Sequence, residues 1–404
     1  MDSKRKHLLP STGQTLEKIS RFCGINLSSY LGRLYNIVLV AFFCFLTHLT
    51  WSDVCMQKCS QHIIKRILVT SFYVLYTLLT LTLRITSLFR PKQFTFPYQE
   101  MLIVDSILES YGAQFSNKDI FIAKNLQDGV IISYWFLIVI LFSQAAIVHK
   151  SIYIMWYTFR AIYLCVSMLL TFGLFSHYVN DIYLRFRELN KIAMRHSEEK
   201  LTVSYIEFTT AGVYDKHDGL VNSKIRSIQH IHHTLFVLAK KVNGNFNLPI
   251  LLGSAILLNG IILYLYDIYN HIKLRDIGAE EVVFQIIFLF WTSLVSIYIS
   301  YTCQRSRNES RRMTKILHDV FLKHKSLRSE VVYFSLQLVH EDLVFTGCGL
   351  FEYNMSLVCS IAGAILTYVV MFVQLDTIAK FLIVSNASSY VENNSTEYVT
   401  TSAA

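Results

Sequence analysis

The last strongly apolar run of the chain reads MSLVCSIAGAILTYVVMFVQL and extends from Met355 to Leu375. At about 20 residues, such a run is long enough to cross roughly 30 Å of hydrocarbon as a helix. Lipid tolerates its valines and leucines, whereas Thr367, Tyr368 and Gln374 need other surroundings.

The polar residues of this run lie on one face of the predicted helix. At 3.6 residues per turn, Gly363, Thr367, Val370 and Gln374 form a single stripe. A glutamine side chain is costly in hydrocarbon unless it finds hydrogen-bond partners or water. The stripe therefore predicts either hydrogen bonds to a neighbouring helix or the wall of an aqueous pore. The spacing alone leaves these two alternatives open.

The composition predicts a membrane protein around this run. Of the 404 residues, 53% are hydrophobic and only 16% are charged, which is more apolar surface than an ordinary core can bury. Residues 1–30 are polar and basic and do not resemble a cleaved signal peptide. Seven windows are long and apolar enough to span a bilayer, at residues 31–50, 67–89, 130–149, 152–178, 248–266, 283–302 and 355–375.

The distribution of basic residues predicts the orientation. With the N-terminus inside, 29 Lys and Arg lie on the cytoplasmic side and 7 outside, and Arg160 lies within a span. Because basic residues are retained in the cytoplasm, this bias favours a cytoplasmic N-terminus and an extracellular C-terminus. The glycosylation acceptors Asn386, Asn393 and Asn394 cluster in the tail that this orientation places outside. The net charge of +9 is a topological signal, and no nucleic-acid partner is expected.

The predicted fold is an all-α bundle of seven transmembrane helices. Amphipathic patterns between the spans indicate that the fourth, fifth and sixth helices continue into a cytoplasmic anchor. Four amphipathic helices that lie on the membrane surface are the alternative. The expected segments are a cytoplasmic N-terminus (1–30), a membrane bundle (31–302) with intracellular extensions (179–247), a helical anchor (303–354), the seventh helix (355–375) and an extracellular tail (376–404).

Several other classes fit less well. G-protein-coupled receptors place the N-terminus outside, and the few prolines do not indicate the broken helices of transporters. No constellation of residues indicates an enzyme. His230, His232 and His233 lack the spacing and the partners of a metal site, so neither metal nor cofactor is expected. Cys55 and Cys59 are the only pair that could form a bridge in the predicted outer loop.

Three stretches of the sequence carry a family resemblance. Thr367-Tyr368, five apolar residues and Gln374 match the TYhhhhhQ signature of the insect gustatory receptors. The runs FTGCGLFEYN, from Phe345 to Asn354, and IQHIHHTLFVLAKKVNGNFNLPILL, before the fifth span, also resemble that family. The chain departs from the usual pattern at Leu375, where Phe is common. It also departs at Val369, where many sugar receptors have an acidic residue.

The resemblance implies a ligand-gated, poorly selective cation channel assembled as a homotetramer or with other gustatory receptor subunits. By analogy, the seventh helices of four subunits surround one pore, with Gln374 at or near the constriction. The pore residues implied are Thr367, Tyr368, Val370, Val373, Gln374 and Asp376. A ring of neutral amides would pass several cations with little discrimination.

The resemblance also implies a ligand pocket among the second to sixth helices, in the half of the bundle that faces outward. Aromatic rings with scattered amides and hydroxyls there suit either a sugar or an apolar, alkaloid-like molecule. The expected ligand is a bitter or other non-volatile tastant, with a sugar as the less favoured ligand. The candidates are Tyr73, Tyr76, Ser143, Gln144, Tyr153, Trp156, Tyr157, Asn259, Tyr264, Gln285 and Trp291. Arg160, inside the fourth span, is either functional or structural. The expected location is the plasma membrane of sensory neurons, among membrane lipid; a metabotropic receptor and a transporter are the alternatives.

Overall fold

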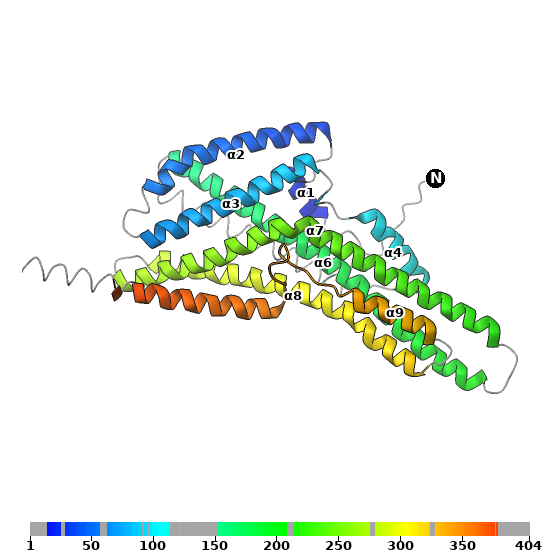
Figure 1. The fold of residues 1–404 in the computed structure, drawn as a ribbon. Helices are drawn as coiled ribbons and strands as arrows, with labels where there is room; N and C mark the ends of the chain where they lie inside the picture. The colour runs from blue at the N-terminus through cyan, green and yellow to red at the C-terminus, as the bar shows by residue number, and fades with distance from the viewer. Residues whose placement is uncertain are drawn as a thin grey trace, which may run out of the picture.

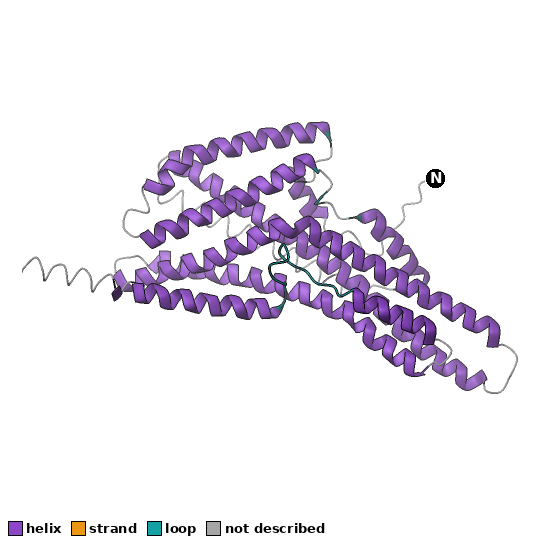
Figure 2. Ribbon diagram, in the orientation of Figure 1, coloured by secondary structure: helices purple, strands orange, loops and turns teal. Residues whose placement is uncertain are grey.

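The computed structural model describes residues 14–25, 29–56, 63–90, 93–94, 97–113, 121, 129, 152–207, 214–274, 279–323, 328–375 and 377–378. These residues are helical almost throughout (Figure 2), which confirms the predicted all-α class. The helices are α1 (Gln14–Phe22), α2 (Tyr30–Met56), α3 (Ile63–Phe89), α4 (Tyr98–Ser110), α6 (Ile152–Glu207), α7 (Tyr214–Leu274), α8 (Ala279–Lys323) and α9 (Arg328–His340). A further helix, Met355–Leu375, is called the last helix below.

Three very long helices determine the shape of the molecule. α6, α7 and α8 contain 56, 61 and 45 residues, which at about 1.5 Å per residue is two to three times the thickness of a hydrocarbon layer. They lie side by side in a bundle with α2, α3 and the last helix, and they project together beyond one end of it (Figure 1). We call the projecting parts of α6, α7 and α8, together with α9, the extension.

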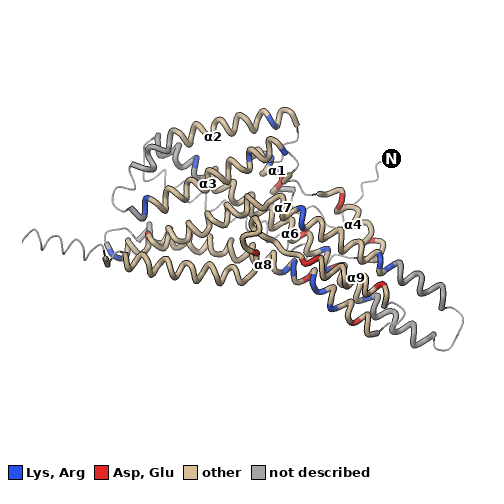
Figure 3. The backbone as a smooth tube through the Cα atoms, viewed as in Figure 1, with Lys and Arg blue, Asp and Glu red and all other residues tan. Residues whose placement is uncertain are grey.

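Charge separates the two regions. Lys, Arg, Asp and Glu side chains gather along the extension, whereas the bundle is almost free of them (Figure 3).

Within the described residues, six helices are long and apolar enough to cross a membrane: Tyr30–His48, Lys65–Phe89, Ile162–Arg195, Lys224–Lys273, Gln285–Leu322 and Met355–Leu375. The span expected at 130–149 lies outside the described residues, so the count of seven crossings and the orientation stay predictions.

The structure corrects two local predictions about α7. The sequence predicts a loop around Gly212 and Gly219, but α7 already begins at Tyr214 and includes Gly219. Pro249 predicts the start of a helix, yet it lies inside α7, which is helical on both sides of it. Glycine and proline disfavour helix interiors by themselves, but packing along the length of a helix can override these local preferences.

The core runs through α6. Phe175, Val179 and Phe186 of this helix are completely buried. A Cβ atom on Gly253 of α7 would lie 2.5 Å from the ring of Phe172, so glycine permits this close approach of α7 to α6. In all, the long helices share one hydrophobic core that continues from the bundle into the extension.

α4 is attached to α6 by a buried ion pair. Arg185 donates two hydrogen bonds to the carboxylate of Asp105, at 2.7 and 2.8 Å, and both side chains are about 5% exposed. Two parallel N–H···O bonds of this kind fix both the distance and the orientation of the partners. This pair therefore positions α4 at the start of the extension.

Candidate functional site

The last helix has one face on the bundle and one exposed face. Phe372 lies nine positions after Gly363, which at 3.6 residues per turn places the two residues on opposite sides of the helix. Phe372 is 6% exposed, whereas Val370 is 54% exposed. Thr367 and Gln374 are exposed as well, and no described atom lies within 4 Å of a Cβ built on Gly363. The stripe of small and polar residues is therefore uncovered in the single subunit.

Of the other predicted pore residues, Val373 lies beside this stripe, whereas Tyr368 lies closer to the face that carries Phe372. Val373 is 41% exposed and Tyr368 42% exposed. Thr367 donates a hydrogen bond from Oγ1 to the carbonyl of Gly363 at 3.0 Å, which satisfies its hydroxyl within the helix. Asp376 lies outside the described residues.

Phe372 joins the last helix to α7. Its ring meets that of Tyr266 edge to face, with centroids 5.1 Å apart. Ile262 completes a small buried cluster, and Leu68 of α3 packs against it. This cluster is separate from the main core. The C-terminal end of the last helix, which we call its far end, is therefore attached to the bundle through a limited set of contacts.

The near end of the last helix is held more firmly. Gln304 of α8 accepts a hydrogen bond from the backbone N–H of Met355 at 2.7 Å, and the side chain of Asn354 accepts one from the N–H of Leu357 at 2.9 Å. These bonds satisfy donors that a helix N-terminus leaves free. Just before the helix, the hydroxyls of Tyr353 and Ser254 are hydrogen-bonded, and burial raises the pKa of Tyr353.

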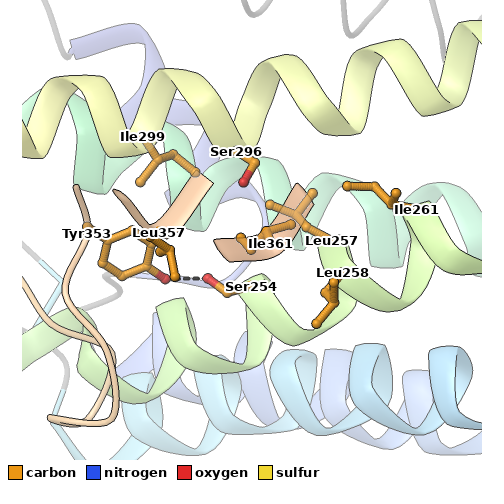
Figure 4. Close-up of a pocket in the computed structure, with 9 residues that line it drawn as sticks. All are labelled: Ser254, Leu257, Leu258, Ile261, Ser296, Ile299, Tyr353, Leu357 and Ile361. Carbon is orange, nitrogen blue, oxygen red and sulfur yellow. Dashed lines mark hydrogen bonds between the residues drawn. The ribbon is translucent and has the colours of Figure 1, made fainter. Parts of the chain in front are cut away.

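A small cavity lies beside this attachment, between α7, α8 and the last helix (Figure 4). Its lining consists of Ser254, Leu257, Leu258, Ile261, Ser296, Ile299, Tyr353, Leu357 and Ile361. Its volume of about 10 Å³ is close to the minimum for a single water molecule. It is therefore too small to be the predicted ligand pocket.

Two of the stretches that carry the family resemblance contact each other. Asn243 Oδ1 accepts a hydrogen bond from the backbone N–H of Thr346 at 3.0 Å, and Asn247 Oδ1 accepts one from the N–H of Cys348 at 2.7 Å. The backbone then turns through positive φ angles at Cys348 and Gly349. These asparagines of α7 thus fix the turn that leads into the last helix.

Arginines of α8 connect the same segment to the extension. Arg307 contacts Glu352 at 2.8 Å and Asp342 at 3.0 Å, and Arg311 contacts Asp342 at 2.7 Å. Hydrogen bonds from Arg311, and then from Arg307, lower the pKa of Asp342. The residues on both sides of the turn are therefore tied to one helix.

A histidine pair on α7 contacts the end of α9. His233 Nδ1 lies 2.5 Å from Glu341 Oε1, and His232 Nδ1 lies 3.6 Å from Oε2. Burial alone would raise the pKa of Glu341, but the neighbouring side chains of His232, Gln337 and His233 lower it to about 2. Among the residues that could be searched, no group of three or more His, Cys, Asp or Glu could hold a metal ion.

Some of the predicted ligand residues come together on α3. The ring of Phe72 lies 4.7 Å from that of Tyr76 and 6.2 Å from that of Tyr73, measured between centroids. The guanidinium of Arg160 lies 5.3 Å from the centroid of the Tyr73 ring. Gly260 of α7 faces Phe72, since a Cβ there would be 3.1 Å from the ring. These residues form an aromatic cluster between α3, α6 and α7.

Three further candidates make pairwise contacts near the far end of the bundle. Asn259 Nδ2 donates to Ser71 Oγ at 2.5 Å, and Gln285 Nε2 lies 2.8 Å from His271 Nε2. Tyr264 stacks on Phe288, with ring centroids 5.4 Å apart. Trp291 is half-buried. Ser143, Gln144 and Cys59, and the side chains of Cys55, Tyr153, Trp156 and Tyr157, lie outside what the structure describes.

Sequence reasoning missed several of these residues. Phe72 and Phe288 gave no signal because they are ordinary apolar residues of transmembrane runs. Sequence reasoning also missed Phe372, although the helical period places it opposite Gly363.

A family model for seven-transmembrane chemosensory receptors matches residues 19–378. The chain belongs to this chemosensory receptor family. The resemblance to insect gustatory receptors is thereby confirmed, and the family is one of receptors and not of enzymes.

Curated relatives agree with this assignment. The receptor is 24% identical over 170 residues to the Drosophila melanogaster gustatory receptor for bitter taste 66a, an alignment covering 40% of this chain and 32% of the relative. It is 26% identical over 160 residues to the putative gustatory receptor 28a of the same organism, covering 37% and 35%. The chain thus spans about a third of the length of these relatives.

Solved structures show the same fold. The insect olfactory receptor OR5 from Machilis hrabei superposes with a TM-score of 0.63 at 12% identity, covering 90% of this receptor and 97% of that chain. Its complex with eugenol gives the same TM-score at 13% identity, over the same shares of both chains. At such identities the likeness concerns the fold alone.

Proposed function

We propose that this receptor is a subunit of a tetrameric ligand-gated cation channel, with the last helix as the wall of its pore. The main support for the proposal is the contrast between the packed face and the uncovered face of that helix. Phe372 holds one face on α7, whereas Gly363, Thr367, Val370 and Gln374 on the other face are uncovered. An exposed glutamine within an apolar span requires water or a polar neighbour. A central aqueous pathway provides both.

Assembly around an axis is supported by α9. Its inner face, with Val331 and Phe334, is buried against the extension. Its outer face presents Val332, Tyr333, Leu336 and Val339 at 45%, 66%, 55% and 74% exposure. The extension is the charged region of the molecule, so lipid does not cover this apolar face. A neighbouring subunit would bury it.

The ligand is proposed to bind near the aromatic cluster of α3, α6 and α7. Tyr73, Tyr76 and Tyr264 offer rings, and Asn259 offers a buried Oδ1 atom that has no hydrogen-bond partner among the described residues. Apolar walls with a few polar groups suit an alkaloid-like molecule. The likeness to a receptor named for bitter taste favours a bitter tastant over a sugar.

Gating is proposed to pass from this region to Gln374 through Tyr266 and Phe372. A ligand that shifts α7 would move Tyr266, and Phe372 would then turn or tilt the far end of the last helix. The near end would stay fixed by its bonds to Gln304 and Ser254. The orientation proposed from the basic residues places the far end at the outer surface of the plasma membrane.

The test is a recording from excised patches of cells that express this chain alone, screened with bitter compounds and sugars. We expect unitary cation currents that begin within milliseconds of ligand application and do not require nucleotides. Responses that vanish on excision and return only with G protein and GTP would contradict the channel. Saturable uptake without current steps would do so as well.

A further inference from the structure

The ends of three helices meet at one level of the molecule. α1 ends at Phe22, and the left-handed φ of +79° at Gly24 turns the chain back towards α2. Tyr35 of α2 donates a hydrogen bond to the carbonyl of Phe22 at 2.8 Å, and Ser87 of α3 donates one to the carbonyl of Gly24 at 3.3 Å. The end of α1 is therefore fixed beside the first turns of α2 and the last turn of α3.

The inner face of α1 is firmly packed. Leu16 is 2% exposed and lies against Gly173 of α6, where a Cβ would be 3.3 Å from its side chain. Glu17 accepts hydrogen bonds from Tyr98 at 2.6 Å and from Tyr178 at 3.3 Å. With this face inward, α1 can turn only its other face, with Lys18 and Arg21, towards the surroundings.

Exposed aromatic and basic residues surround this junction. The aromatic ones are Phe22, Tyr30 and Phe89, at 78%, 83% and 77% exposure. The basic ones are Lys18, Arg21, Arg33 and Arg90, all exposed. None of these four cations has an ion-pair partner among the residues that the structure describes. We call these seven residues the α1 surface.

Cations of the extension behave differently. Arg226 is paired with Glu330, Arg311 with Asp342 and Lys241 with Glu100. Because the extension satisfies many of its cations internally and the α1 surface does not, the α1 surface has positive charge available for an external partner.

The position of the α1 surface identifies the kind of partner. α2 and α3 cross the membrane, and the surface lies where the first begins and the second ends. This is the boundary between hydrocarbon and headgroups, where aromatic side chains concentrate in membrane proteins. Basic residues at this depth attract acidic headgroups, and an amphipathic helix such as α1 lies naturally in that plane.

We propose that the α1 surface binds anionic phospholipid, with the headgroup on its cations and the acyl chains against Phe22, Tyr30 and Phe89. Bound lipid then stabilises α1 against the bundle. Assignment to the inner leaflet rests on the orientation proposed above, whereas binding itself does not depend on orientation or on channel activity.

The experiment uses the purified full-length protein in nanodiscs of phosphatidylcholine alone or with phosphatidylserine in both leaflets. Native mass spectrometry measures retained lipid, and the melting temperature reports stability. The variant replaces Lys18, Arg21 and Arg90 with Gln. The matched control replaces three exposed cations of the extension, Arg195, Lys240 and Lys315, with Gln. A second variant, Phe22→Ser, tests the acyl contact without changing the charge.

We expect phosphatidylserine to be retained and to raise the melting temperature of the wild type and the control. Each interfacial cation contributes about a fivefold factor in lipid affinity, so the triple variant should bind roughly 100-fold more weakly. High salt should weaken binding in the wild type but change little in the triple variant. Equal retention by the triple variant and the control would overturn the proposal. Equal retention of the zwitterionic lipid by the wild type would also overturn it.

Discussion

Phe372 and Gln374 are two residues apart on the last helix and face nearly opposite directions. The first is buried against Tyr266 of α7, and the second is exposed. A rotation of the helix that is imposed at Phe372 must therefore also turn Gln374, because both side chains belong to one rigid turn. This relationship connects the proposed ligand-binding region with the proposed pore.

Replacing Phe372 with Ala should uncouple ligand binding from opening. An edge-to-face aromatic pair contributes about 0.5–1.5 kcal/mol beyond its buried area, so we expect the half-maximal ligand concentration to rise about 2–10-fold and the maximal current to fall. Dose–response recordings, normalised to surface expression, measure both. Met371→Ala is the control, since that side chain is already 39% exposed. Equal effects of the two variants would refute the coupling role.

Changes at Gln374 should alter permeation and leave ligand affinity unchanged. A fourfold ring of Arg would repel cations, and a ring of Glu would concentrate them. We expect Gln374→Arg to reduce unitary cation conductance severely and Gln374→Glu to increase it. Single-channel recordings of the two variants provide an internal control, because both side chains are long and polar. Identical conductances would remove Gln374 from the pore.

Asn259 should affect ligand affinity. Within the part of the chain that the structure describes, its buried Oδ1 has no hydrogen-bond partner, while Nδ2 is bonded to Ser71. A neutral hydrogen bond contributes about 0.5–1.5 kcal/mol, so Asn259→Ala should raise the half-maximal concentration of a donor-bearing ligand about 2–10-fold. In contrast to Phe372→Ala, the maximal current should persist. A reduced maximum without a shifted concentration would place Asn259 outside the ligand site.

The Glu341 contact predicts a dependence of stability on pH. The folded-state pKa of about 2 lies below the ordinary value of 4.5. Stabilisation by this carboxylate is therefore fully present above pH 4.5 and is lost as the pH falls towards 2. Glu341→Gln should lower the melting temperature at neutral pH. Its melting temperature should then decrease less than that of the wild type as the pH falls from 4.5 towards 2.

The control for Glu341 is Asp319→Asn, an exposed carboxylate of the extension with no described ion pair. Thermal unfolding of the detergent-solubilised protein between pH 7 and pH 3 separates the two variants. If the melting temperature of Glu341→Gln fell below pH 4.5 as much as that of the wild type, the histidine contact would not contribute to stability.

The sequence predicts much of the last helix and little of its attachment. The stripe of Gly363, Thr367, Val370 and Gln374 is readable because a helical period fixes which residues share a face. The contact between Phe372 and Tyr266 depends on how α7 packs, which no local pattern encodes. The turn at Cys348 was likewise not foreseen, because the asparagines that fix it lie about a hundred residues earlier.

The long helices were also only partly predictable from the sequence. Amphipathic spacing indicates helices below the bilayer, and Met313, Ile316, Leu317 and Val320 are buried there. The uninterrupted course of α7 through Gly219 and Pro249 contradicts local propensity, since contacts along the whole helix outweigh two unfavourable positions. The ion pairs of Arg307 with Asp342 and Glu352 could not be chosen from among many possible charge pairs.

Cysteine accessibility along the last helix tests the pore most directly. Single cysteines at 363, 367, 370 and 374, and at the bundle-facing positions 361 and 372, are exposed to a charged aqueous thiol reagent during recording, in a background with native Cys359 replaced by Ser. We predict that reagent blocks current at the four stripe positions, faster with agonist, and leaves 361 and 372 unmodified. Protection of all four stripe positions in the presence and absence of agonist would contradict a water-filled pathway lined by this helix.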